Sequence, residues 1–560
     1  MFPRFEGFGE CFELQGIFFY YSNMTVPCDR PWFAFWPKDV PRRIAYPEIL
    51  LQQILVNSAA RDPHHPALIS GNTRMTYHEL NLASTRFGAA LLALGVDRGD
   101  RVMLVLPNIP EFVIAYYGVL KIGAIMTAAS PLSKEYELEV RLQDADPKVI
   151  VCERYHVPLL SHSVRQKSSK ILISVGEDKV RDVHRFNELI ARANPSTLRH
   201  VDRHSKNGLA VLQYTGGTTG RPKGAMMTHS NLVANAIQNA LWFTWSRNDI
   251  VLGVLSLCHT WGLCTSINSA IYTGATIVLV PRFDPEEVLG IIEKERITIA
   301  YGSATMFHLL LDSPEREKRN LSSLRLAKAG AMPIPGEVKR RWDDLGLCEL
   351  ILGYGLTEAS PETHDSPLES VRTGTIGIPI IDTDAKIVDI ETGTKELGPN
   401  EVGELILRGP QVMKGYWKNS QETDGVLREG WLHTGDLATM DEDGFFSIVD
   451  RKKDLIKYKG YSIFPAELEN ALYDHPAVRE CAVVGKPLAD VGEIPKAYVV
   501  VHKGSTVTER GLMEFIEQRC APFKKIREVE FVGEIPKTVV GKTLRRALRG
   551  GKTEFQTERR

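Results

Sequence analysis

The sequence lacks the features that would set it apart from ordinary globular proteins. It has 560 residues and a formal net charge of -1, so no excess of basic residues points to a nucleic-acid-binding surface. Its eight cysteines are scattered without a C-x-x-C pair, which argues against a disulfide framework and against a zinc site. No internal repeat or low-complexity segment is visible. We therefore expect a cytoplasmic protein that binds no nucleic acid.

Long hydrophobic runs are missing as well. The apolar stretch at residues 16–21 is too short for the core of a signal peptide or for a membrane span. We therefore expect no integral membrane segment. Residues 1–23 are interpreted as an accessory N-terminal extension, with Met24 as an alternative start of the protein.

From about residue 95 the sequence alternates between strand-like apolar runs and helical segments. A run at 101–106 precedes a helical stretch at 110–122, which Gly123 ends, and a second helical segment covers 284–295. Further strand-like runs lie at 148–152, 171–175, 275–280, 297–302, 324–329 and 349–352. This alternation predicts an α/β fold with layers of largely parallel sheet.

After about residue 376 the pattern changes to short strands separated by glycine and aspartate turns, which predicts a β-rich subdomain at about 376–450. A charged stretch at 450–454 follows, and the last hundred or so residues contain their own helix at 465–473, with proline in its first turn. We place a domain boundary at 450, between an N-terminal domain of residues 24–450 and a small α+β domain of residues 454–560.

A glycine- and threonine-rich loop at residues 214–224 is the strongest local motif. Its glycines let backbone N–H groups approach an anion, its threonines add hydroxyl donors, and Lys223 adds a positive charge. The loop differs from a Walker A loop because Pro222 precedes Lys223 and no serine or threonine follows. We predict a phosphate-binding loop, with a solvated turn as the plain alternative. The candidate residues are Thr215, Gly216, Gly217, Thr218, Thr219, Gly220 and Lys223.

Taken with other motifs in a fixed order, this loop resembles the acyl-adenylate-forming superfamily, which includes acyl-CoA synthetases, aryl-CoA ligases, beetle luciferases and the adenylation domains of peptide synthetases. The matching motifs cover residues 76 to 546. Besides the loop they are Thr76-Tyr77-x-x-Leu80, Gly353-Tyr354-Gly355-Leu356-Thr357-Glu358, Trp431-x-His433-Thr434-Gly435-Asp436, Asp450-Arg451-x-Lys453-Asp454 and Pro536-Lys537-Thr538-x-x-Gly541-Lys542.

The resemblance implies that the protein binds ATP and Mg²⁺ at the motif from Gly353 to Glu358. Tyr354 would stack on adenine, Thr357 would bond phosphate, and Glu358 would hold the metal ion. Asp436 would accept hydrogen bonds from the ribose hydroxyls, and Arg451 would lie on the ribose or phosphate side. Gly353, Gly355 and Ala331 complete the nucleotide set. The plain alternatives are a strand-end turn with Glu358 in solvent, and a turn-capping role for Asp436.

The resemblance also assigns roles to the C-terminal residues. Lys542 would stabilise charge on the α-phosphate, and Lys453, within the hinge 451–453, would let the C-terminal domain swing between two catalytic orientations. The pantetheine arm of coenzyme A would pass Lys457, Lys459, Gly460 and Tyr461. The plain alternatives are a surface lysine at 542 and a solvated linker at 451–453.

For the acid, the resemblance places His259 beside the carboxylate, which makes His259 a catalytic candidate together with Lys542, Thr357 and Glu358. The implied pocket walls are His259, Trp261, Met306, Phe307, Gly330, Ala331 and Met332. Core packing is the plain alternative for the apolar members. Such walls favour a medium-chain, alicyclic or aromatic acid.

These expectations combine into an ATP-dependent acid–thiol ligase that forms an acyl-adenylate and then the acyl-CoA thioester, with ATP, Mg²⁺ and coenzyme A as its cofactors and co-substrates. Two enzymatic alternatives share the first stage: transfer of the acyl group to a carrier protein, and luciferase-like oxidation of the adenylate. A non-enzymatic alternative is a nucleotide-sensing interaction protein that retains the fold. Whether the protein forms a homodimer is left open.

Overall fold

The computed structural model describes residues 11–14, 17–20, 30–160, 170–176, 182–198, 205–215, 222–459, 461–488, 491–537 and 543–549. The chain divides into two compact units, of which the first comprises Met1–Asp384 with Arg408–Leu432 and the second Ala385–Leu407 with His433–Arg560. The boundary that the sequence predicts at residue 450 lies inside the second unit. That boundary and the hinge 451–453 stay predictions.

The first sheet of the first unit has the strand order β11-β10-β6-β5-β7-β8-β9. Its central strands run parallel, and only the β10–β11 edge is an antiparallel hairpin. The bounds are β5 (Arg101–Val105), β6 (Ile125–Ala128), β7 (Val149–Glu153), β8 (Ile171–Val175), β9 (His184–Arg185), β10 (Leu209–Thr215) and β11 (Lys223–Thr228). The runs predicted at 101–106, 148–152 and 171–175 are thereby confirmed.

The second sheet has the order β18-β17-β16-β15-β14-β12-β13-β3-β4. It is parallel from β16 to β3 and antiparallel at both ends, where β16 turns back into β17 and β3 into β4. The bounds are β3 (Pro66–Ser70), β4 (Thr73–Thr76), β12 (Ile250–Gly253), β13 (Thr276–Leu279), β14 (Ile299–Ser303), β15 (Leu326–Gly330), β16 (Leu350–Gly355), β17 (Glu362–Asp365) and β18 (Ile378–Pro379).

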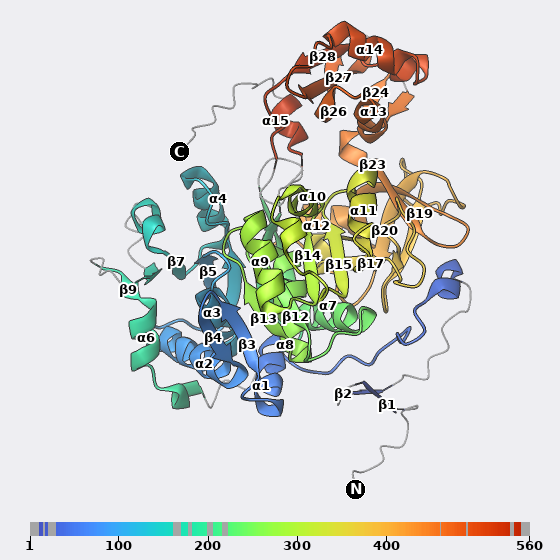
Figure 1. Cartoon of the computed structure of the whole chain (residues 1–560). Helices are drawn as coiled ribbons and strands as arrows, with labels where there is room; N and C mark the ends of the chain where they lie inside the picture. The colour runs from blue at the N-terminus through green and yellow to red at the C-terminus, as the bar shows by residue number, and fades with distance from the viewer. Residues whose placement is uncertain are drawn as a thin grey trace. The chain divides into compact units, whose positions relative to one another are not determined.

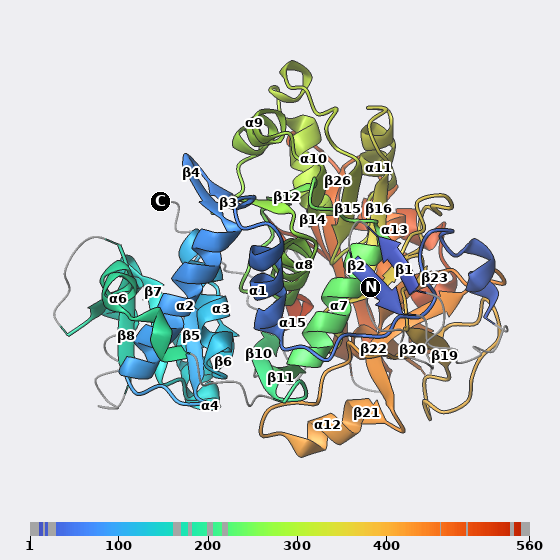
Figure 2. The same cartoon turned by 90° about the horizontal axis from the view of Figure 1, so that it is seen from below.

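Helices lie between the two sheets and outside them (Figure 1). In the inner layer, α3 contacts β5 and β6, α7 contacts β10 and β11, and α8 contacts β13 (Figure 2). A buried π-helical segment, Gly262–Ser269, continues into α8 and meets α3 where Tyr117 Oη donates to Asn268 Oδ1 at 3.3 Å. The remaining bounds are α1 (Leu51–Arg61), α2 (Tyr77–Ala93), α3 (Pro110–Lys121), α4 (Glu135–Ala145), α6 (Phe186–Arg192), α7 (His229–Trp242), α8 (Ala270–Thr273), α9 (Pro285–Glu295), α10 (Ala304–Asp312), α11 (Gly336–Asp343) and α12 (Ser420–Val426).

The outer face of the second sheet is closed by α9, α10 and α11. Apolar side chains of these helices form one core cluster with strands β12 to β16, in which Val288, Phe307 and Trp342 are nearly inaccessible to water. The helix α9 begins after Asp284, whose Oδ1 accepts the Glu287 backbone N–H at 2.9 Å, as an N-cap should. The helix predicted at 284–295 is thus confirmed.

The second unit combines two sheets, of which the second has antiparallel pairs from β25 to β26 and one parallel pair, β27 with β28. One contains β19 (Asp384–Val388), β20 (Gly403–Arg408), β22 (Trp431–Met440) and β23 (Phe446–Arg451). The other has the order β25-β24-β27-β26, with β28 paired to β27, and α13 and α14 pack on it (Figure 1). Its bounds are β24 (Ile456–Tyr458), β25 (Tyr461–Ile463), α13 (Pro465–Tyr473), β26 (Val478–Leu488), β27 (Gly492–Val501), α14 (Glu509–Glu517), β28 (Glu528–Phe531) and α15 (Arg545–Arg549).

The predicted N-terminal extension contains two short antiparallel strands, β1 (Cys11–Leu14) and β2 (Ile17–Tyr20). In the described part of the chain, no helix combines the length and the apolar character needed to cross a membrane.

Burial of His364 on β17 makes the stability of the fold sensitive to acid. Burial lowers the pKa of His364 to about 3, whereas an unfolded chain binds that proton near pH 6.5. Stability from this group is therefore full above pH 6.5 and is lost as pH falls toward 3, by about 2 kcal/mol between pH 7 and pH 5. We expect His364→Gln to remove that part of the acid sensitivity.

Urea unfolding at the two pH values measures this effect, and His64→Gln, at an exposed histidine, is the control. Equal losses of stability in the wild type and His364→Gln would contradict it.

Candidate nucleotide and acid site

The predicted phosphate loop joins β10 to β11. Thr215, the last residue of β10, pairs with Lys223, the first residue of β11. Gly224 allows β11 to pack closely, because a Cβ there would lie 2.8 Å from Leu212 Cδ1. Both ends of the loop are therefore fixed by the hairpin. Outside the described residues lie Gly216, Gly217, Thr218, Thr219 and Gly220.

Lys223 lies between a carboxylate and an aromatic ring. Its Nζ is 2.7 Å from Glu422 Oε2 on α12, and the Lys223 side chain is only 11% exposed. The same Nζ lies 5.4 Å from the centroid of the Tyr416 ring, within the range of a cation–π contact. Tyr416 is held beside β11 by a backbone bridge to Ala225.

Tyr416 also reaches the turn that carries the predicted nucleotide contacts. Its hydroxyl donates to Glu358 Oε1 at 2.7 Å, and the Met413 backbone N–H donates to the Glu358 carbonyl at 2.8 Å. Burial, followed by the charge of Glu358, raises the pKa of Tyr416. Tyr416 therefore stays a hydrogen-bond donor at physiological pH and connects the predicted phosphate-binding cation to the predicted metal ligand.

The turn itself runs from β16 into β17. Gly355 pairs with Glu362, and a Cβ at Gly355 would lie 2.2 Å from the Pro361 carbonyl oxygen, so only glycine fits. A 3₁₀ turn covers Thr357–Ala359. Tyr354 meets His364 edge-on, with ring centroids 5.8 Å apart.

A buried ion cluster lies beneath this turn. Lys328 Nζ on β15 is 2.8 Å from Glu362 Oε2 and 2.6 Å from Asp365 Oδ1, and all three side chains are at most 3% exposed. Burial pulls the pKa of Lys328 down, but the two carboxylates outweigh burial and hold that pKa above its ordinary value. Burial raises the pKa of Asp365 despite Lys328. One ammonium faces two carboxyl groups in so dry a place, so burial outweighs the attraction of Lys328 at Asp365.

Gly353 belongs to this cluster as well. A Cβ at Gly353 would lie 2.3 Å from both Asp365 Oδ1 and Lys328 Cε. The glycine therefore makes room for the ion cluster, which is a packing reason that its motif did not suggest. Whether Gly353 and Gly355 also approach a nucleotide stays a prediction.

Two of the predicted pocket walls, Trp261 and Gly330, meet where β15 ends. Trp261 is 8% exposed, and a Cβ at Gly330 would lie 2.9 Å from its Cη2 atom, so the indole lies directly against Gly330. Ala331 follows with a φ of 67°, a left-handed conformation that favours glycine. Thr305 Oγ1 lies 3.6 Å from Met332 Sδ.

The two predicted pocket residues on α10, Met306 and Phe307, have different surroundings. Phe307 packs edge-on against Trp342, with ring centroids 4.9 Å apart, as a core residue does. Met306 is partly buried at the edge of the same cluster. The pocket roles of both residues stay predictions.

The loop before Trp261 is held by two side chains that sequence reasoning did not assign to the site. Asn108 Nδ2 donates to the Gly253 carbonyl at 2.9 Å and its Oδ1 accepts the Leu257 N–H at 3.0 Å. Gln213 Nε2 donates to the Cys258 carbonyl at 2.7 Å. Asn108 follows β5 and Gln213 lies within β10, so the first sheet holds the backbone of the segment that leads to His259. A Pro-Asn turn at 107–108, after the first strand-like run, is the sequence signal that points to Asn108.

In the second unit, Asp436 and Arg451 face each other across β22 and β23. Arg451 Nε lies 2.8 Å from Asp436 Oδ1, and the Asp436 side chain is 5% exposed. Glu404 lies nearby, 2.8 Å from Lys452 Nζ, and accepts the Gly435 N–H at 3.2 Å. The two predicted ribose contacts are therefore neighbours. Their nucleotide roles stay predictions.

The predicted coenzyme A residues lie on the β24–β25 hairpin and next to it. Lys457 and Lys459 are exposed, and Lys459 has a φ of 48°. Tyr461 is 55% exposed and stacks on Phe523, with ring centroids 4.5 Å apart. Lys453, at the predicted hinge, is exposed just before the buried Asp454. Gly460 and Lys542 lie outside the described residues.

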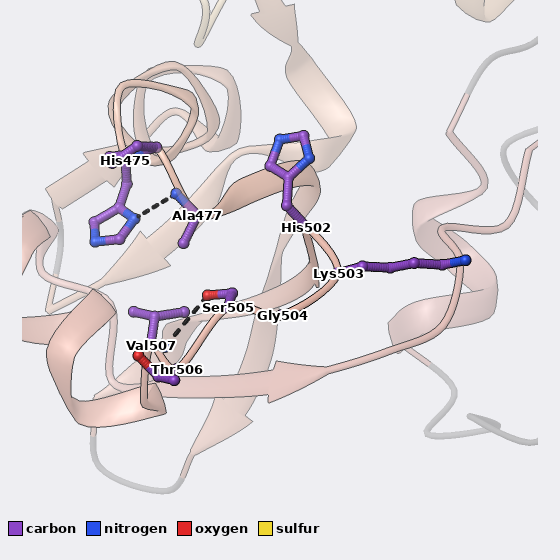
Figure 3. Close-up of a pocket in the computed structure, with 9 residues that line it drawn as sticks. His475, Ala477, His502, Lys503, Gly504, Ser505, Thr506 and Val507 are labelled. Atoms are coloured by element: carbon purple, nitrogen blue, oxygen red, sulfur yellow. Dashed lines mark hydrogen bonds between the residues drawn. The ribbon is translucent and has the colours of Figure 1, made fainter.

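An open hollow of about 490 Å³ lies elsewhere in this unit. Figure 3 shows that it is lined by two short segments, one around His475 and the other from His502 to Val507. Its hydrogen bonds are local, such as the Ala477 N–H to His475 Nδ1 at 3.1 Å. None of the predicted site residues that the structure describes lines it.

The sequence matches two protein families along most of its length. Residues 55–417 match AMP-binding enzyme, and residues 467–542 match AMP-binding enzyme C-terminal domain. The chain belongs to the AMP-binding enzyme family. The family assignment confirms the resemblance to the acyl-adenylate-forming superfamily, in its acyl- and aryl-CoA ligase branch, and the α/β fold with a smaller C-terminal domain.

Two relatives of the chain are CoA ligases by name. The chain is 39% identical over 552 residues to a long-chain-fatty-acid–CoA ligase of Bacillus subtilis, covering 94% of this chain and 98% of that protein. It is 37% identical over 503 residues to 4-coumarate-CoA ligase 1 of Narcissus pseudonarcissus, covering 86% and 90%. Among solved structures, ATP-bound MatB from Rhodopseudomonas palustris aligns with a TM-score of 0.83 at 29% identity, covering 90% and 99%.

We expect Tyr416→Phe to weaken ATP binding while leaving the fold intact. The variant keeps the ring under Lys223 but removes the hydroxyl that orients Glu358, and a buried hydrogen bond to a charged group is worth about tenfold or more in affinity. Calorimetric titration with ATP measures the change. Tyr46→Phe is the matched control, because Tyr46 Oη makes a comparable 3.0 Å contact with Asp382 Oδ2. Equal ATP affinity in the two variants would contradict the positioning role of Tyr416.

Proposed function

We propose that this AMP-forming acyl-CoA synthetase activates a medium-chain, alicyclic or aromatic carboxylic acid and transfers it to coenzyme A. The observation that carries the proposal is the contact of Tyr416 with both Lys223 and Glu358. One side chain therefore contacts both the cation of the predicted phosphate loop and the predicted metal ligand. A site for a metal–triphosphate requires two such groups close together.

In the first stage, a carboxylate oxygen of the acid attacks the α-phosphate of ATP, the bond between the α- and β-phosphates breaks, and pyrophosphate leaves. Lys223 and Lys542 stabilise the charge that develops on the phosphates. His259 lies beside the acid carboxylate. The product is a mixed anhydride with a good leaving group, which a free carboxylate lacks.

Magnesium fits this site through Glu358. Mg²⁺ is usually held by one or two carboxylates together with substrate phosphates and water, and among the described residues no cluster of three metal-ligating side chains assembles. Glu358 Oε1 already accepts from Tyr416, so Glu358 Oε2 would be the oxygen available to hold the ion. When bound, the ion neutralises the triphosphate.

In the second stage, the coenzyme A thiolate attacks the acyl carbon, and the bond to AMP breaks. Lys457, Lys459, Gly460 and Tyr461 form the channel for the thiol arm, and residues 454–560 swing about Lys453 to present it. The exposure of Lys457, Lys459 and Tyr461 on one hairpin supports this assignment.

The close contact between Trp261 and Gly330 supports a short, walled pocket. Similarity to a long-chain-fatty-acid ligase makes a longer acid the second candidate. The two candidates differ in the depth available beyond Ala331, since each buried methylene contributes about 0.8 kcal/mol until the pocket floor is reached.

We expect a panel of acids, from acetate to long-chain fatty acids and cinnamates, to give its highest kcat/KM for coenzyme A-dependent AMP formation with an apolar acid of roughly six to ten carbons. Ala331→Gly should lengthen the accepted chain. Because Ala331 has a positive φ, glycine is well tolerated there, and the variant should fold normally.

A preference for acetate or an amino acid would contradict the proposed apolar pocket. A preference for long chains in the wild type would select the second candidate. An unchanged chain-length profile in Ala331→Gly would show that Ala331 packs in the core and does not form the floor of the pocket.

A further inference from the structure

Lys223, which binds phosphate in the proposed function, forms an ion pair with Glu422. Lys223 Nζ lies 2.7 Å from Glu422 Oε2, and the lysine side chain is 11% exposed against 33% for the glutamate. A cation so shielded from water interacts strongly with whichever anion is next to it. The chain therefore provides Lys223 with a counter-anion of its own.

The packing of α12 does not depend on this pair. No residue of α12 is buried. The helix is held instead by its cap, where Asn419 Oδ1 accepts the Glu422 backbone N–H at 3.1 Å, and by Thr423 Oγ1, which accepts the Tyr416 N–H at 2.8 Å. Because these contacts use the Glu422 backbone and its neighbours, the Glu422 carboxylate is free to turn toward solvent without loss of the helix.

Lys223 keeps a second contact that an exchange of anions leaves in place. Its Nζ lies 5.4 Å from the Tyr416 ring centroid, and the Lys223 backbone is fixed by pairing with Thr215. The ammonium group can therefore stay where it is while its anionic partner changes from a carboxylate to a phosphate.

We propose that Glu422 is an internal counter-anion that the phosphates of ATP displace from Lys223, so that Glu422 sets the affinity of the site for polyphosphates. The proposal rests on the proposed function, in which Lys223 binds phosphate. Binding of ATP must break the ion pair, and the energy of that pair is subtracted from the energy of binding. Highly charged ligands compete with the carboxylate and uncharged ligands do not.

We expect Glu422→Gln to bind ATP and inorganic pyrophosphate more tightly, by roughly three- to tenfold at low salt. Its affinity for adenosine should be unchanged, because adenosine carries no phosphate. Calorimetric titration of the full-length protein with ATP, pyrophosphate and adenosine measures all three affinities. Asp424→Asn is the matched control, since it removes the same charge from an exposed position on the same helix.

A double-mutant cycle with Lys223→Met separates this proposal from the proposed function. If Lys223→Met alone weakens ATP binding, Lys223 binds phosphate, and the gain from Glu422→Gln should then vanish in the double variant. If Lys223→Met leaves ATP affinity unchanged, the assignment of the phosphate loop fails.

Three results would overturn the counter-anion role while leaving the phosphate loop intact. They are unchanged or weaker ATP binding in Glu422→Gln, an equal gain for adenosine, and an equal gain in Asp424→Asn.

Discussion

The buried positive charge of Lys328 is the constraint on which the β16–β17 turn and the site around it depend. A lysine in the middle of a parallel strand, with two carboxylates against it and almost no exposure to water, is costly unless every member of the group is paired. Both carboxylates lie on β17, directly after the turn that carries Thr357 and Glu358. The cluster thus fixes how β17 returns against β16, and with it the turn between them.

From that turn, one chain of contacts leads outward to the phosphate loop. Glu358 accepts from Tyr416, the Tyr416 ring lies under Lys223, and Lys223 pairs with Glu422. Catalysis of phosphate chemistry requires opposite charges to be held apart at a fixed spacing until the substrate arrives. An aromatic ring with a hydroxyl at its edge does this, because one face attracts the ammonium group while the hydroxyl holds the carboxylate.

Sequence reasoning recovered what depends on local pattern. The strand at 171–175 and the helix at 465–473 agree with β8 and α13 to the residue, because hydrophobic periodicity and an N-terminal proline are local signals. Tyr416, Glu422 and Lys328 were missed, since each acts through partners far away in the sequence. Gly353 was recognised as part of a motif, but its packing against Lys328 and Asp365 requires three strands to be placed first.

Separate measurement of the two half-reactions in Lys542→Ala tests the central claim, a two-stage ligase in which Lys542 serves only the first stage. The account predicts that acid-dependent exchange of labelled pyrophosphate into ATP slows by roughly a hundredfold or more, while thioester formation from supplied acyl-adenylate and coenzyme A is preserved. A bulky substitution at Gly460 should give the reverse pattern. Equal loss of both half-reactions in a folded Lys542→Ala protein would contradict the two-stage account and the hinge at Lys453.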